Sequence, residues 1–270
     1  MIRALAQLFR PRLALLNGVT AVGGYLLFPG DPERIALWAA FCGVVFLAAG
    51  GSALNQVLER DLDRLMVRTK QRPLPQGQLT PNSATAIGAS VILIGLMLLG
   101  AIGGLMPALL GAAALAWYLF VYTPLKRRTP LALMIGALSG ALAPPIGWCL
   151  AGGHPSDYRI VLLAGLLYLW QIPHFWLLQR RHADDYHAAG IPLFGASEKS
   201  AGFLWVWIMA LVAATMLLPA LGVVQQHVSV WYALLPLPLI VMAMLRFETA
   251  LFSYLNLFPL LVTLLFCIQR

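Results

Sequence analysis

Three polar residues recur at intervals of four at the end of a long apolar stretch: Asn55, Glu59 and Asp63. On an α-helix this spacing places one amide and two carboxylates within an arc of about 80°, along about 12 Å of one stripe. Because the stripe begins inside an apolar segment, these groups are costly without partners. Oxygen ligands of this kind bind Mg²⁺ together with substrate phosphates. The stripe therefore predicts a metal and diphosphate site. The alternative is an ordinary helix end whose acids and bases pair in solvent.

Positively charged residues follow the stripe closely. Arg68, Lys70 and Arg72 lie in the same polar segment, and arginine is the better bidentate partner for phosphate oxygens. A second basic group, which includes Lys126 and Arg127, lies in the segment 122–130. We expect the first group to contact phosphates and the second to contact phosphate or propionate groups. The alternatives for the second group are a positive-inside anchor and a site for lipid headgroups.

A second polar segment contains the adjacent acids Asp184 and Asp185, followed by Tyr186. Neighbours on a helix diverge by about 100°, so only one of the two acids faces a given metal unless the helix has already ended. Two acidic clusters on opposing helices would bind two metal ions that flank one diphosphate; the alternative is an i,i+4 ion pair between Arg181 and Asp185. His174 lies in the last turns of the preceding apolar stretch. It is either a hydrogen-bonded structural residue or a contact for a substrate or porphyrin.

The composition indicates that membrane helices position these residues. Of the 270 residues, 60% are hydrophobic and 10% are charged, against roughly 25% charged residues in ordinary soluble proteins. The mean hydropathy is +0.81, and a soluble chain of this size could not hide so much apolar surface. The 24 Gly and 18 Pro residues favour interrupted helices over a β-barrel of alternating polarity. The three cysteines lie in apolar runs without C-x-x-C spacing, which indicates neither a disulfide nor a thiolate metal site.

Apolar runs long enough to cross a bilayer predict an all-α bundle of about nine transmembrane helices. These runs cover residues 13–28, 35–58, 85–102, 105–121, 131–151, 160–178, 203–223, 230–245 and 250–268. With the N-terminus in the cytoplasm, 15 of the 18 Lys and Arg residues lie in cytoplasmic segments, as the positive-inside rule requires. This topology explains the net charge of +8, so we expect no nucleic acid as a partner. No A-x-A site follows the first run, which favours an uncleaved first span over a signal peptide.

The predicted cytoplasmic segments differ in length. Two of them, at about 59–84 and 179–202, are long and polar, and they follow the second and sixth helices. This layout predicts two four-helix units and one extra helix, with the site at the cytoplasmic end between the two units. We expect the whole chain, residues 1–270, to form a single transmembrane domain in a bacterial cytoplasmic (inner) membrane.

The polar segments resemble those of a known family. The series Asn55-x-x-x-Glu59-x-x-x-Asp63 resembles N-x-x-x-D-x-x-x-D, the first acidic motif of the UbiA-type intramembrane prenyltransferases. The segments 55–73, 122–148 and 173–192 are similar, more narrowly, to the branch of this family that farnesylates protoheme IX. Two departures stand out. Glu59 replaces the aspartate of much of the family, and the second acidic cluster lacks the D-x-x-x-D spacing.

The resemblance implies a UbiA-like bundle of nine helices and a Mg²⁺-dependent reaction. Farnesyl diphosphate would lose pyrophosphate, and a vinyl group of heme b would capture the allylic cation to give heme O. The residues expected to bind metal and to be catalytic are Asn55, Glu59, Asp63, Asp184 and Asp185. Those expected to bind substrates are Arg68, Lys70, Arg72, Lys126, Arg127, His174 and Tyr186. The implied partners also include membrane lipid and a hand-over to heme A synthase or to terminal oxidase assembly.

Two other functions remain open at this stage. The same chemistry could use an aromatic quinone precursor, such as 4-hydroxybenzoate, as the acceptor. An ion-coupled transporter would use the acidic stripe as an ion path, but it predicts acids near the bilayer midplane on broken helices. Here the stripe continues into a long polar segment beside cations, which favours phosphate chemistry. A phosphatidyl-alcohol transferase would need a D-G-x-x-A-R type of motif, which the sequence lacks. Trans-prenyl synthases are soluble and carry D-D-x-x-D.

Overall fold

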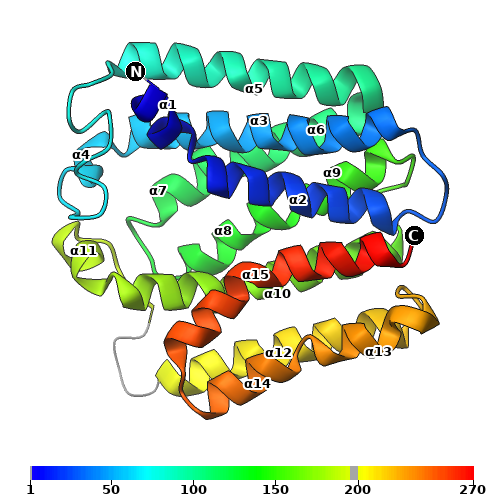
Figure 1. Cartoon of the computed structure of the whole chain (residues 1–270). Coiled ribbons are helices and arrows are strands. Elements are labelled where there is room, and N and C mark those ends of the chain that lie inside the picture. Colours follow the sequence, from blue (N-terminus) through cyan, green and yellow to red (C-terminus); the bar gives the residue numbers. More distant parts are fainter. Residues whose placement is uncertain (1, 195–199) are drawn as a thin grey trace.

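The computed structural model describes residues 2–194 and 200–270, and all the regular elements in these ranges are helices (Figure 1). They are α1 (Ile2–Phe9), α2 (Pro11–Leu27), α3 (Arg34–Leu58), α4 (Arg60–Asp63), α5 (Pro81–Gly103), α6 (Leu105–Ala116), the π-helix η1 (Trp117–Tyr122), α7 (Thr123–Leu125), α8 (Ala132–Ala141), α9 (Ala143–Leu150), α10 (Tyr158–Arg181), α11 (Ala183–Ala188), α12 (Ser200–Ala220), α13 (Gln226–Leu234), α14 (Leu237–Met244) and α15 (Glu248–Ile268).

Eight helical segments in the described ranges are long and apolar enough to cross a membrane. Three of them are composite: α6–η1–α7, α8–α9 and α13–α14. The first predicted span corresponds to α2, whose 17 residues are at the lower limit for a spanning helix. The prediction of an all-α membrane bundle with about nine spans is therefore confirmed. The chain is an integral membrane protein.

The polar loops that carry the predicted site meet at one end of the bundle. Figure 1 shows α1, α4 and α11 at this end, whereas the C-terminus lies at the opposite end. Termini at opposite ends agree with an odd number of spans. The two long polar segments are far apart in the sequence, but the helices before them end at the same end of the bundle. The packing of the helices side by side therefore brings these segments together.

The helix that carries the acidic stripe is not continuous. Helix α3 ends at Leu58, and Glu59 has φ −109° and ψ 9° before the short helix α4 begins. The prediction of one unbroken helical stripe was therefore wrong in this detail. The spacing survives the break, because the amide of Glu59 still donates to the carbonyl of Asn55 (2.9 Å) and that of Asp63 to the carbonyl of Glu59 (2.8 Å). Arg127 caps the end of α3 by donating to the carbonyl of Leu58 (2.9 Å).

A π-helix interrupts the fourth span next to the site. The Thr123 hydroxyl donates to the carbonyl of Tyr118 (2.9 Å), and Pro124 supplies no backbone N–H. These two residues disturb the ordinary i→i−4 register, and such π-helical turns are frequent at functional sites. The rings of Tyr118 and Tyr122 stack as a result, with centroids 5.9 Å apart.

Close packing of α2 on α9 fixes the first span in the bundle. A Cβ atom at Gly24 would overlap the backbone of Pro144, and one at Gly147 would overlap the carbonyl of Ala21. Small residues of this kind let membrane helices approach closely, where van der Waals contact replaces the hydrophobic effect as the main attraction. The C-terminal half of α2 is thereby held against α9.

Candidate active site

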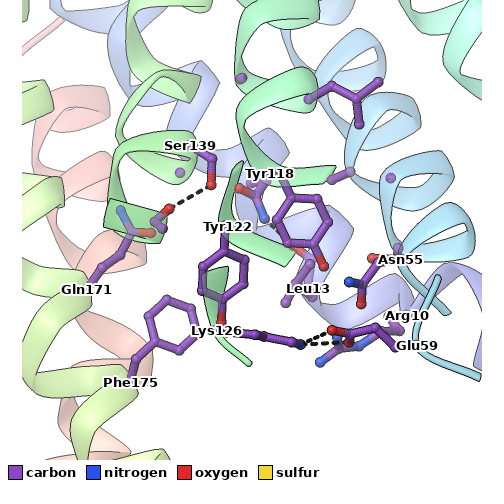
Figure 2. A pocket seen from close by; sticks show the side chains of 18 of the residues that line it. Arg10, Leu13, Asn55, Glu59, Tyr118, Tyr122, Lys126, Ser139, Gln171 and Phe175 are labelled. Atoms are coloured by element: carbon purple, nitrogen blue, oxygen red, sulfur yellow. Dashed lines mark hydrogen bonds and ion pairs between the residues drawn. The ribbon is translucent and has the colours of Figure 1, made fainter. Parts of the chain in front are cut away.

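A cavity of about 250 Å³ extends from the polar loops into the bundle (Figure 2). Its wall is built by α2, α3, α6, η1, α8, α9 and α10. The mouth is polar. Further in, the wall is apolar, and it includes Val44, Leu47, Gly111, Ala143 and Ile146, which we call the apolar branch. A charged mouth above an apolar branch suits a ligand with an anionic head and a hydrocarbon tail.

All three residues of the acidic stripe line this cavity and are buried: Asn55 is 4%, Glu59 4% and Asp63 2% exposed. The Asn55 amide nitrogen donates to the hydroxyl of Thr123 (3.1 Å). This bond fixes the amide, so its oxygen is the atom left for another ligand. The three side chains that the spacing placed on one stripe therefore line one cavity, and their role as metal ligands stays a prediction.

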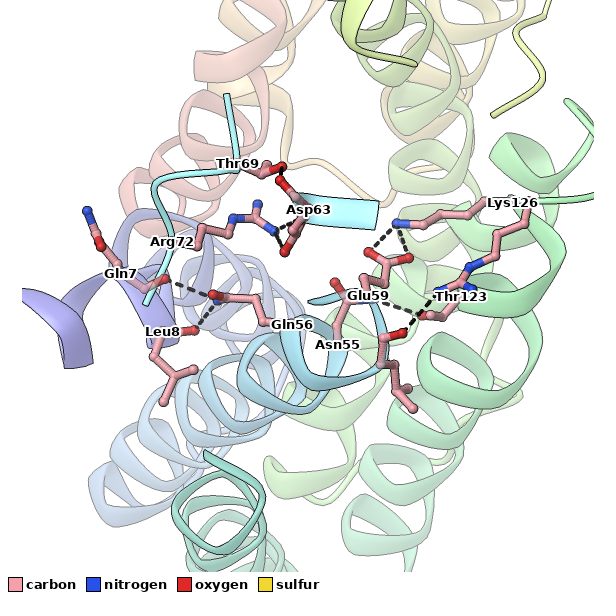
Figure 3. Close-up of polar contacts among 12 residues, drawn as sticks. Gln7, Leu8, Asn55, Gln56, Glu59, Asp63, Thr69, Arg72, Thr123 and Lys126 are labelled. Carbon is pink, nitrogen blue, oxygen red and sulfur yellow. Dashed lines mark hydrogen bonds and ion pairs between the residues drawn. The ribbon is translucent and has the colours of Figure 1, made fainter. Parts of the chain in front are cut away.

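Each acid of the stripe is already paired with a cation (Figure 3). Lys126 Nζ lies 2.6 Å from both carboxylate oxygens of Glu59 and donates its hydrogen bond to Oε2. Arg72 Nη1 contacts both carboxylate oxygens of Asp63, at 2.8 and 2.7 Å. A buried carboxylate is costly without such a partner. The two acids and the two cations together carry no net charge, so the pairing keeps the mouth stable before any ligand binds.

The loop between α4 and α5 folds back around Asp63. Thr69 donates from its hydroxyl to the Asp63 carbonyl (2.9 Å), and Met66 is buried beside it. Arg68 is exposed and lines the cavity, whereas Lys70 is exposed and does not. Of the basic residues expected to bind substrate, the structure therefore brings Arg68, Arg72 and Lys126 to the cavity. Lys70 and Arg127 lie outside its lining.

The second acidic pair lies on α11, beside this loop. Asp184 is exposed, and neither it nor Asp185 lines the cavity, although Tyr186 does. The Asp185 carboxylate accepts hydrogen bonds from the backbone amides of Val67 (2.7 Å) and Arg68 (3.3 Å). In the part of the chain that the structure describes, no three His, Cys, Asp or Glu side chains converge as a metal site. The assignment of Asp184 and Asp185 as metal ligands stays a prediction.

His174 faces away from the lining of the cavity. Its ring stacks between those of Trp170 and Phe252, with centroid distances of 5.1 and 5.3 Å, while its neighbour Phe175 lines the cavity. Arg181 lies over the ring of Phe252 at 5.6 Å, rather than forming the ion pair with Asp185 that was the alternative to a metal site. A contact between His174 and a porphyrin stays a prediction.

Arg10 is a candidate site residue that the spacing of charges did not reveal. It lines the cavity with a left-handed backbone (φ 48°, ψ 62°), which is uncommon for a residue other than glycine. Gln56, next to Asn55 on α3, donates to the carbonyls of Gln7 (3.1 Å) and Leu8 (2.7 Å) and so holds the end of α1. Burial lowers the pKa of the Arg10 guanidinium below its ordinary value. The Arg-Pro pair at a helix start was the available signal.

Uncharged residues also line the cavity. Tyr118 and Tyr122 project from η1, and Gln171 and Phe175 from α10, toward the interior in Figure 2. Aromatic rings attract cations through their faces. The site therefore combines a paired polar mouth with an aromatic wall and an apolar branch. It can hold an anionic leaving group at the mouth and shelter a carbocation further in.

Comparisons with known proteins agree with this geometry. The model of the UbiA prenyltransferase family matches residues 17–265. A protoheme IX farnesyltransferase of Geobacter sulfurreducens is 62% identical over 260 residues, covering 95% of this chain and 96% of the relative. Another, of Oleidesulfovibrio alaskensis, is 41% identical over 223 residues, covering 81% of this chain and 78% of the relative.

Solved structures share the fold at low sequence identity. One, described for digeranylgeranylglyceryl phosphate synthase, has a TM-score of 0.78 at 18% identity and covers 99% of this chain and 98% of its own. A UbiA homologue of Archaeoglobus fulgidus bound to GPP and Mg²⁺ has a TM-score of 0.74 at 15% identity, with 98% and 99% covered. The resemblance noted in the sequence is thus confirmed: this chain belongs to the UbiA prenyltransferase family.

Proposed function

We propose that this chain transfers a farnesyl group from farnesyl diphosphate to a vinyl group of heme b, giving heme O and pyrophosphate. The observation that carries the proposal is the 62% identity to a protoheme IX farnesyltransferase over 95% of this chain. The cavity supports the same chemistry, because acids and cations surround its mouth and apolar residues line its interior. Quinone precursors stay the alternative acceptors.

We assign Asn55, Glu59 and Asp63 to a divalent cation, with Mg²⁺ as the expected ion. The donor set fits such an ion: an amide oxygen left over by the Thr123 contact and two buried carboxylates. The Glu59 Oε1 atom makes no hydrogen bond and is held only by its ionic contact with Lys126. A bound metal would stabilise negative charge on the departing diphosphate. A related protein of the same fold, from Archaeoglobus fulgidus, binds Mg²⁺ together with GPP.

Lys126 and Arg72 would bind the diphosphate oxygens. In the structure Arg72 is paired with Asp63, and Lys126 with Glu59. If a diphosphate entered together with a metal ion, both basic residues and both acids would exchange their present partner for a ligand. The cations then contact phosphate and the acids face the metal. Arg68 and Arg10 line the same mouth and add positive charge where it develops in the leaving group. Cations placed beforehand in this way stabilise the transition state of ionisation.

The apolar branch would hold the farnesyl tail. Asn55 and Val44 lie eleven residues apart on α3, which corresponds to about 16 Å along a helix axis. A twelve-carbon main chain has eleven bonds and, extended at about 1.2 Å per bond, spans roughly 13 Å. The depth of the branch therefore matches a farnesyl chain. The aliphatic wall also keeps water from the allylic carbon.

The acceptor would approach along the aromatic wall. Tyr122 and Phe175 both line the cavity (Figure 2), and their ring faces would stabilise a cation after the C1–O bond breaks. The terminal vinyl carbon then forms a bond to C1. Water adds a hydroxyl group to the other vinyl carbon and releases one proton.

We place the chain in a bacterial cytoplasmic (inner) membrane, with the N-terminus and the site on the cytoplasmic side. The support is the gathering of basic loops at one end of the bundle (Figure 1), as the positive-inside rule requires. Heme O made there would pass to heme A synthase or to terminal oxidase assembly.

The proposal is tested by mass spectrometry of hemes from bacteria that lack heme O synthase, with and without this chain. We expect a hydroxyethylfarnesyl adduct of heme only when the chain is expressed, and none with the D63N variant. Membranes are then incubated with labelled farnesyl diphosphate and either heme b or 4-hydroxybenzoate. Label in the benzoate alone would overturn the heme assignment. Unchanged pyrophosphate release by D63N, with loss of a solute flux, would instead indicate a transporter.

A further inference from the structure

A contact between the two polar segments joins a side chain to a backbone. The Asp185 carboxylate accepts from two consecutive amides, Val67 through Oδ1 (2.7 Å) and Arg68 through Oδ2 (3.3 Å). The partners are more than a hundred residues apart in the sequence, and they belong to α11 and to the loop that follows α4. Hydrogen bonds to a charged acceptor are stronger than those between neutral groups.

This contact holds a loop that also binds Asp63 in the cavity. We call residues 64–72 the basic loop. From within, Thr69 and Arg72 bind the backbone and the carboxylate of Asp63. From outside, Asp185 binds Val67 and Arg68. Without the outer attachment, the exposed amides would turn to water, and the position of Arg68 at the mouth would no longer be fixed.

The same contact engages both oxygens of the carboxylate that the sequence assigned to a metal ion and turns it toward the loop. Both oxygens of Asp185 accept amide hydrogens, and the side chain lies outside the cavity lining, as does the exposed Asp184. Tyr186, the next residue, does line the cavity, so α11 lies beside the mouth without presenting its acids to it. The absence of a D-x-x-x-D spacing agrees with this placement.

We propose that Asp185 is a positioning residue, which holds the basic loop and thereby Arg68 over the mouth, and that it does not ligate the metal. The inference rests on the proposed function only in that the mouth binds a prenyl diphosphate. Loss of the contact should weaken the hold on the diphosphate, while the affinity for Mg²⁺ stays the same. A metal ligand would show the opposite pattern.

Three variants separate the two roles. In D185N the side-chain amide has one acceptor oxygen, so it can accept from only one of the two backbone amides. Its NH₂ group would face the other backbone N–H, and it cannot accept that hydrogen bond. D185E keeps the carboxylate and should restore most of the contact. H187Q changes an exposed side chain of the same helix, α11, that lies outside the cavity lining, and it serves as the matched control.

The experiment uses the full chain in lipid nanodiscs. For D185N we expect the KM for farnesyl diphosphate and the Kd for its thiolodiphosphate analogue to rise about tenfold. The half-saturating Mg²⁺ concentration at saturating farnesyl diphosphate should stay within twofold, with H187Q and D185E close to the parent chain. In the absence of substrate, trypsin should cleave D185N faster after Arg64, Arg68 or Lys70. A tenfold rise in half-saturating Mg²⁺ for D185N, or equal effects of H187Q and D185N, would overturn the inference.

The trypsin readout distinguishes this inference from the proposed function. It needs no substrate, so faster cleavage of D185N supports the contact even if the parent chain transfers no farnesyl group. Equal cleavage of D185N and the parent chain refutes the role of Asp185 even if heme O is made.

Discussion

Replacement of Lys126 with methionine tests the exchange of partners at the mouth. K126M keeps the length and apolar character of the side chain and removes its ammonium group. The structure predicts two effects of opposite sign, because Lys126 contacts Glu59 at 2.6 Å in the free protein and would contact the diphosphate in the complex. Diphosphate binding and ionisation should weaken, whereas a divalent cation alone should bind more tightly to the unpaired Glu59.

The size of each effect follows from burial. The Glu59 side chain is 5% exposed and that of Lys126 20%, so removal of one partner of this pair costs about 3–5 kcal/mol when nothing replaces it. Metal binding at Glu59 recovers part of that cost, which gives at least a tenfold gain in affinity at about 1.4 kcal/mol per decade. Loss of one cation that stabilises the leaving group costs about 3–4 kcal/mol, or 10²–10³ in rate.

The assay measures both quantities on the same preparation. Binding of Mn²⁺ to the substrate-free protein is followed by electron paramagnetic resonance, and pyrophosphate release is followed in a single turnover with farnesyl diphosphate and heme b. R128M is the control, because Arg128 lies in the same basic segment but is exposed and outside the cavity lining; exposed charges of this kind contribute little. Unchanged Mn²⁺ affinity in K126M, or a loss of less than tenfold in pyrophosphate release, would refute the exchange of partners.

Three further predictions address the apolar branch, the helix packing and the strained arginine. V44W shortens the apolar branch, so geranyl diphosphate should become a better substrate than farnesyl diphosphate, as measured by competition between the two. G147A places a methyl group on the carbonyl of Ala21 and should destabilise the fold by about 1–3 kcal/mol, seen as a lower Tm; G165A, where nothing lies within 4 Å, should leave the Tm equal or higher. R10K keeps the charge of Arg10 but loses the guanidinium fork, and we expect the KM for farnesyl diphosphate to rise about tenfold with kcat less affected.

The spans and the acidic stripe were predictable because they depend on local properties. Apolar length determines a membrane helix, and a spacing of four determines which side chains share a face. For this reason Asn55, Glu59 and Asp63 meet at one cavity even though the helix breaks at Glu59. The end of the bundle that carries the site could also be predicted, because basic residues gather in the loops there.

The remaining parts of the site depend on contacts between distant segments. The partner of Asp185 is a pair of backbone amides in another loop, and no pattern of side chains indicates such a partner. Tyr118 and Tyr122 lie on a π-helix in which the hydroxyl of Thr123 donates to the carbonyl of Tyr118, in a run that otherwise reads as an ordinary span. Arg10 reaches the mouth because Gln56 holds the end of α1. Each of these features involves a hydrogen bond made by a polar group. The periodicity of apolar residues, on which the prediction of helices depends, does not reveal such bonds.

The pairing of charges at the mouth explains why acids and cations are interleaved along the same segment. A site for a metal diphosphate needs carboxylates for the cation and basic groups for the phosphates, and either set alone would be costly at the edge of a bilayer. Asp63 with Arg72, and Glu59 with Lys126, cancel in the free protein. A metal diphosphate also carries little net charge, so it can take the place of these pairings without leaving a buried charge unpaired. The metal alone would satisfy only the acids, and the diphosphate alone only the basic groups. The two binding affinities must therefore be coupled. By linkage, each ligand raises the affinity for the other by the same factor.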